Sequence, residues 1–142
     1  MRSGTITRFG CSVLACAALL AASDAGAADA PCVVEITPPP PSLGADAPGL
    51  KREAEAEVRQ QAALLHGRRK VVISVAVLRR EAPLFCSVNA TVRDARTGAM
   101  LAVIATDARA VGTVSAEQKK ELAYAAVRSA VRSVPKALDA SR

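Results

Sequence analysis

The segment that most constrains the fold is residues 86–110, which reads as two strands joined by a tight turn. From Cys86 to Arg93, apolar or small side chains alternate with polar ones, which places one set on each face of an extended chain. Asp94 can bond its own backbone and begin a turn, and Gly98 can adopt a positive φ and end it. A second apolar run follows over residues 99–106. The sequence therefore predicts a β-hairpin, and this hairpin carries no catalytic chemistry.

The rest of the chain predicts a short strand, a helix, a long strand and a closing helix. Residues 31–37 form the short strand, which ends at the prolines of 38–41 because proline has no backbone N–H to donate. A narrow apolar stripe predicts a helix over residues 50–66. The β-branched run 71–78 predicts a strand at the centre of the sheet. A Ser-x-x-Gln capping box opens a helix over residues 115–134.

Amphipathic helices bury their apolar stripe against a sheet. The order strand, helix, three strands, helix therefore predicts an α+β fold, a two-layer sandwich. Its four-stranded sheet is expected to be mainly antiparallel, with two helices packed on one face. The predicted organisation is a signal peptide over residues 1–27, a short strand and Pro-rich linker over 28–49, a single α+β domain over 50–135 and a flexible tail over 136–142.

Residues 1–27 have the pattern of a secretory signal peptide. Arg2 and Arg8 make the first part basic, residues 11–22 are apolar, and residues 25–27 offer small side chains at a cleavage site. The apolar run is shorter than the roughly 20 residues that span a bilayer. The sequence therefore predicts export and a secreted or periplasmic location.

The alternative is an outer-membrane lipoprotein anchored through Cys16. Residues 13–16, Val-Leu-Ala-Cys, are similar to the site at which bacterial lipoproteins are cut and acylated on cysteine. The apolar run continues to residue 22, so a cut at Cys16 would leave half of it on the mature chain. A membrane partner is expected only if Cys16 carries a lipid.

Removal of the leader leaves two cysteines, Cys32 and Cys86. Two thiols exported to an oxidising compartment most often pair, so a Cys32–Cys86 disulfide is predicted, and two buried unpaired thiols are the alternative. Apolar residues make up 51% of the sequence and aromatic residues only 2%, with alanine dominant. Small side chains bury little area, so the core should be thin and a disulfide would matter to its stability.

The sequence offers no arrangement typical of a catalytic, metal or cofactor site. His66 is the only histidine, and it stands at a helix end beside basic residues. There is no carboxylate pair, no Ser-His pairing, no metal-ligand spacing and no phosphate-binding glycine loop. The protein is therefore predicted not to be an enzyme and to need no cofactor.

Lysine and arginine number 19 against 13 aspartates and glutamates, for a net charge of +6. Basic residues flank both ends of the strand predicted over 71–78, and we treat them as a possible cationic patch: Arg68, Arg69, Lys70, Arg79 and Arg80. Such a patch could bind an anionic envelope polymer or lipid head groups. Nucleic acid is disfavoured because the chain has no aromatic stacking platform.

The order of the strand over 71–78, the strand over 86–93, the turn Asp94-Ala-Arg-Thr-Gly98 and the closing Ala-rich helix is similar to small periplasmic α+β domains. Such domains occur in bacterial envelope-assembly lipoproteins and in uncharacterised secreted proteins of the myxobacterial type. The resemblance covers about residues 71–134. It implies a non-catalytic role in the envelope and assigns no functional residue.

Two functions follow as hypotheses. The first is an exported, non-catalytic interaction or structural domain that contacts an envelope protein through a face or edge of its sheet. The second is a periplasmic module that binds a small apolar or anionic ligand between sheet and helices. The sequence leaves the oligomeric state and the partner open.

Overall fold

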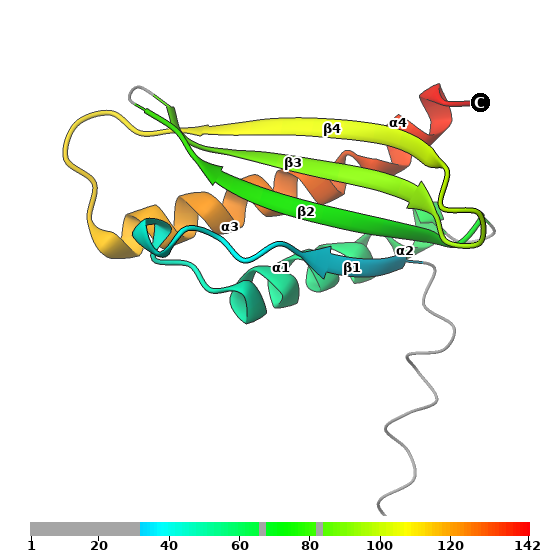
Figure 1. Cartoon of the computed structure of the whole chain (residues 1–142), viewed down its shortest axis with the longest axis horizontal. Coiled ribbons are helices and arrows are strands. Elements are labelled where there is room, and N and C mark those ends of the chain that lie inside the picture. The colour runs from blue at the N-terminus through cyan, green and yellow to red at the C-terminus, as the bar shows by residue number, and fades with distance from the viewer. Residues whose placement is uncertain (1–31, 66–67, 82–83) are drawn as a thin grey trace, which may run out of the picture.

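A four-stranded sheet with helices against one face makes up the part of the chain that the computed structural model describes, residues 32–65, 68–81 and 84–142 (Figure 1). The strands are β1 (Cys32–Ile36), β2 (Val71–Arg79), β3 (Leu84–Asp94) and β4 (Met100–Arg109). They lie side by side in the order β1-β2-β3-β4. The predicted signal peptide, the lipidation site at Cys16 and His66 all lie outside the described residues.

The sheet is mixed, which corrects the prediction of a mainly antiparallel sheet. β2 pairs antiparallel with β3, and β3 with β4, as a run of hairpins requires. β1, however, runs parallel to β2, with Cys32 opposite Val71 and Ile36 opposite Val75. Parallel neighbours need a long crossover between them. The segment between β1 and β2 supplies it, because it carries a helix across one face of the sheet before the chain returns.

The predicted element order is retained with three short helical additions. The two long helices are α1 (Ala47–Gln60) and α3 (Ala116–Arg132), and the additions are η1 (Pro41–Leu43), α2 (Ala62–Leu65) and α4 (Val134–Ala140). The capping box of α3 is confirmed, since Gln118 N donates to Ser115 Oγ at 3.2 Å and Ser115 N donates to Gln118 Oε1 at 2.8 Å.

The structure differs from the sequence prediction at two segments expected to lie outside the core. In the Pro-rich linker, the side chain of Leu43 is fully buried, and Asp46 caps α1 three residues earlier than predicted by accepting from Gly49 N. Beyond α3, residues 134–140 form a helix rather than a flexible tail. Pro135 fits its first turn, where no backbone N–H is needed, and Leu138 is buried.

The core lies between one face of the sheet and the two long helices (Figure 1). β2 contributes every second residue from Val71 to Val77, and β3 every second residue from Cys86 to Val92, all at most 2% exposed. The alternation predicted for residues 86–93 is therefore confirmed. The helices contribute small side chains to the same layer, among them Ala54, Ala123, Ala126 and Ala130. Small residues let α1 and α3 lie close to each other and to the sheet, which forms a thin core from short side chains.

The predicted Cys32–Cys86 disulfide is wrong, and both cysteines are free and buried. Cys32 lies opposite Val71 and Cys86 opposite Arg79, at the two ends of β2. Those ends are eight residues, or about 26 Å, apart along the strand. A disulfide requires Cα atoms within about 7 Å, so one chain cannot form this bridge. Burial raises the pKa of the Cys32 thiol to about 11 and also raises the pKa of Cys86.

We expect both thiols to be reduced and shielded in the native protein. Intact-mass measurement before and after a reductant should show no change. In denaturant both thiols should react with a thiol reagent, and in buffer the reaction should be at least about tenfold slower, because burial and a raised pKa suppress the thiolate. Denatured, unreduced protein that offers no reactive thiol would contradict this.

One buried carboxylate connects α1 and α3. The side chain of Glu57 is 1% exposed. Arg132 donates two hydrogen bonds to it, from Nε to Oε1 at 2.9 Å and from Nη2 to Oε2 at 3.1 Å. Gln61 Nε2 donates to Oε1 as well, at 3.0 Å. The hydrogen bonds from Arg132 hold the pKa of Glu57 below its usual value in spite of its burial. This carboxylate therefore stabilises the helical layer in its charged form.

Because its pKa is lower in the folded protein, Glu57 stabilises the fold above the unfolded pKa of about 4.3, and this contribution is lost as the pH falls through the folded pKa. Glu57→Gln should lower the free energy of unfolding by about 1–2 kcal/mol at pH 7, as measured by urea denaturation. The two proteins should converge in acid. The matched control is Glu55→Gln, whose exposed contact with Lys51 is 3.8 Å long and should cost less than about 0.5 kcal/mol.

Candidate anion-binding site

The predicted cationic patch is divided between the two ends of β2. Arg68, Arg69 and Lys70 precede the strand, while Arg79 ends it and Arg80 follows. Arg79 lies nine positions after Lys70, which is about 30 Å along an extended chain. At the far end, Arg80 Nε donates to Ser87 Oγ at 2.9 Å. The five residues are therefore not one surface, and only the first group lies at a hollow.

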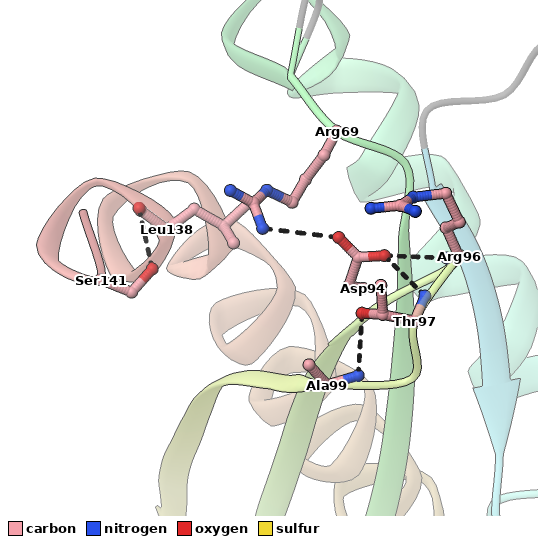
Figure 2. Close-up of polar contacts among 7 residues, drawn as sticks. All are labelled: Arg69, Asp94, Arg96, Thr97, Ala99, Leu138 and Ser141. Carbon is pink, nitrogen blue, oxygen red and sulfur yellow. Dashed lines mark hydrogen bonds and ion pairs between the residues drawn. The ribbon is translucent and has the colours of Figure 1, made fainter.

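Three segments meet at the first end of β2: the loop before β2, the turn between β3 and β4, and the end of α4 (Figure 2). They enclose two hollows that share Arg69, and we call the pair the Arg69 pocket. The larger has a volume of about 640 Å³ and is lined by Arg68, Arg69, Leu101, Leu138, Ser141 and Arg142. The smaller measures about 380 Å³ and is lined by Arg69, Lys70, Asp94, Ala95 and Arg96.

The turn predicted at residues 94–98 is confirmed, and it shapes the smaller hollow. Asp94 Oδ1 accepts from the backbone N–H groups of Arg96 and Thr97, both at 2.9 Å (Figure 2). Gly98 takes φ +72° and donates to the Asp94 carbonyl at 2.8 Å. Ala95 N donates to the Lys70 carbonyl at 3.0 Å, which joins the turn to the loop before β2. These bonds bring the basic residue at position 96 to the basic loop at 68–70.

The positive charge of the pocket exceeds its negative charge. Five of its side chains are cationic, and the carboxylates beside them are Asp94 and Asp139. Backbone N–H groups of Thr97 and Arg96 hold the pKa of Asp94 below its usual value, so Asp94 is charged at neutral pH. Its Oδ1 accepts hydrogen bonds from two backbone N–H groups of the turn. Its Oδ2 is the oxygen that contacts a cationic side chain, that of Arg69.

The arginines of the pocket differ in how firmly they are held. Arg68 is held by the fold, since its Nη1 lies 2.8 Å from Asp139 Oδ1 and its Nε donates to the Leu64 carbonyl at 2.7 Å. The side chain of Arg69 is 63% exposed, and its contact with Asp94 Oδ2 is 3.4 Å long. Arg96 makes no side-chain hydrogen bond or ion pair within the described residues. Two guanidinium groups, those of Arg69 and Arg96, can therefore receive a ligand.

The donors of the pocket suit an anion and not a metal ion. Guanidinium and ammonium groups donate hydrogen bonds and cannot coordinate a cation. Among residues 32–65, 68–81 and 84–142, no group of histidine, cysteine and carboxylate side chains could hold a metal. The hydroxyl at the rim, Ser141 Oγ, donates to the Leu138 carbonyl at 3.0 Å (Figure 2).

The sequence prediction included three residues of this pocket and missed Arg96, Arg142 and the role of Asp94. Strand pairing gives a signal for Arg96. In an antiparallel pair, the residue before one strand lies beside the residue after the other, so the loop at 68–70 must meet the turn at 95–99 once β2 and β3 pair. Arg142 gave no such signal, because its place depends on how α4 packs against β4.

Comparison with known proteins adds little to the geometry. No protein-family model and no characterised protein sequence matches the chain. Among solved structures, a protein from Caulobacter crescentus described as a "putative lipoprotein" is similar, with 13% sequence identity and a TM-score of 0.41 over 78% of this chain and 89% of that one. Identity and TM-score are too low for this similarity to indicate a shared function. In the part of the chain described here, no helix is long and apolar enough to cross a membrane.

The turn should tolerate loss of the Asp94 charge but not of its oxygen. Asp94→Asn keeps an acceptor for the two backbone N–H groups, and Asp94→Ala removes it. We expect Asp94→Ala to lower Tm by about 5 °C or more and Asp94→Asn by less than about 2 °C, measured by circular dichroism. Equal shifts for the two variants would show that these bonds do not stabilise the turn.

Proposed function

We propose that this chain is an exported, non-catalytic protein of the bacterial cell envelope that binds phosphate groups of an anionic envelope polymer in the Arg69 pocket. The observation that carries the proposal is that Arg69 and Arg96 line one hollow beside Asp94, whose Oδ1 already accepts two backbone hydrogen bonds of the turn. Export is supported by the signal-peptide pattern of residues 1–27.

The chemistry of the pocket favours phosphate. A guanidinium group presents paired N–H donors that match two oxygens of a phosphate, and two such groups can hold one phosphate from both sides. Arg69 must leave a single 3.4 Å contact with Asp94 to do so, which costs little because the contact is long and exposed. The larger hollow adds Leu101 and Leu138, and such an apolar wall fits the sugar or glycerol unit between phosphates.

The absence of catalysis is part of the proposal. Hydrolysis of a phosphate ester would need a nucleophile with a base beside it, or a metal ion. The hydroxyl of the pocket, Ser141, donates to a backbone carbonyl instead of to a base. A pocket of this kind holds an anion without transforming it.

The test compares variants that each remove one positive charge. A soluble oligomer of glycerol phosphate is titrated into the purified protein by calorimetry in low salt. Arg69→Gln and Arg96→Gln should each weaken binding about five- to tenfold. The matched control, Arg79→Gln, removes the same charge at the other end of β2 and should change binding less than about twofold. Asp94→Asn removes the competing carboxylate and should strengthen binding about two- to fivefold.

Equal weakening by Arg79→Gln would mean that net charge alone attracts the oligomer, which would contradict a pocket. The source of the phosphate is tested with vesicles of phosphatidylcholine, with and without phosphatidylglycerol. Binding to the anionic vesicles with the same variant pattern, and no binding to the oligomer, would assign the pocket to a lipid head group instead.

A further inference from the structure

The second face of the sheet carries no described helix (Figure 1). Within the described residues, six large hydrophobic side chains are exposed, and four of them belong to this face. They are Val33 at 54%, Leu78 at 39%, Met100 at 66% and Val103 at 60% exposed. We infer that a second copy of the chain packs on this face, so that two sheets meet face to face in a symmetric dimer.

The shape of the face suits another sheet. Strand register places the side chains of this face in rows across the four strands, with Glu35, Ser74, Thr91 and Val103 in one row, of which Ser74 and Thr91 are half-buried. In the next row towards the far end of β2, Ala76 lies opposite Asn89, which lies opposite Ala105. The middle of the face therefore consists of small side chains. A flat surface of small residues lets a second sheet approach to the usual spacing of about 10 Å.

The charges on this face cancel one another. Arg93 Nη2 on β3 donates to Glu35 Oε2 on β1 at 3.1 Å. Ser74, on β2 between those two strands, donates from Oγ to the same Glu35 oxygen at 2.9 Å. Towards the other end, Arg80 bonds Ser87, whose neighbour on β4 is Asp107. The sequence as a whole has a net charge of +6, so two copies repel each other except where charges are balanced. The balanced face is thus the surface on which copies can meet.

The polar side chains of the face favour a copy over a lipid surface or the apolar stripe of a helix. Thr91 and Asn89 can each donate and accept hydrogen bonds, whereas the Ser74 hydroxyl already donates to Glu35 and accepts from Arg93 Nη2 at 2.9 Å. An apolar partner would bury these groups without partners, which costs free energy for each one. The same face on a second copy supplies an equal number of donors and acceptors. Self-pairing therefore satisfies both the apolar and the polar side chains.

The area available is sufficient for a weak dimer. Four strands about 4.8 Å apart and about 29 Å long give a face of about 550 Å², or about 1,100 Å² in total for two copies. Specific interfaces begin near 1,000 Å² in total, and the smallest belong to transient partners. The dimer should accordingly dissociate on dilution.

The test is sedimentation velocity of the purified protein from about 1 to about 500 μM. The wild type should shift from monomer to dimer within this range. Val103→Asp should weaken the dimer at least about tenfold, because it buries two unpaired charges across the interface. The matched control is Val111→Asp, which places the same change on a side chain that is 94% exposed in the loop after β4 and should leave the dimer intact.

A second variant separates packing of faces from pairing of edges. Ala76 lies on β2, an inner strand of the sheet, so Ala76→Glu should dissociate a face-to-face dimer and spare one joined through the edge strand β4. The Tm of each variant shows that it is folded. A wild type that stays monomeric at the highest concentration would overturn the inference. So would a dimer that Ala76→Glu leaves unchanged, or one that Val111→Asp weakens as much as Val103→Asp. Arg69→Gln should dimerise as the wild type does, so the outcome is independent of the proposed phosphate site.

Discussion

Burial of alternate side chains of β2 and β3 beneath α1 and α3 is the interaction on which the other features depend. Once Val71, Ile73, Val75 and Val77 face the helices, their neighbours on β2 must face away. The same two-residue alternation of side chains along each strand places Cys32 and Cys86 in the core and Val103 on the uncovered face. A slip of one residue in register would exchange the two faces, so the packing of the core also determines the surface.

The helical layer has its own support in the buried carboxylate of Glu57. Short side chains contribute little burial per residue, and among the described residues the largest fully buried apolar side chains are leucine, isoleucine and valine, with no aromatic ring. A charged group taken out of water must be fully satisfied, and Arg132 and Gln61 do this across α1 and α3. Arg128 Nη1 on α3 also donates to Glu53 Oε2 on α1 at 2.7 Å, so two directional contacts join helices that otherwise pack through small apolar side chains.

The Arg69 pocket and the uncovered face occupy different parts of the molecule and have opposite electrostatic character. The pocket lies at one end of β2 and concentrates positive charge, whereas the face extends along the strands and balances its charges. If both proposals hold, a dimer would carry two basic pockets and could bind two sites on one polymer. Two linked sites raise the apparent affinity without any new contact.

The sequence by itself determined the local structure of this protein. Alternation over residues 86–93, the Asp94 and Gly98 turn and the Ser115 capping box are local patterns, and each is present as predicted because short-range hydrogen bonds and side-chain period decide it. The tertiary structure alone decided the direction of β1 and the separation of the two cysteines. These depend on the path of the crossover and on strand register, which join residues far apart in the chain and leave no periodic signal in its sequence.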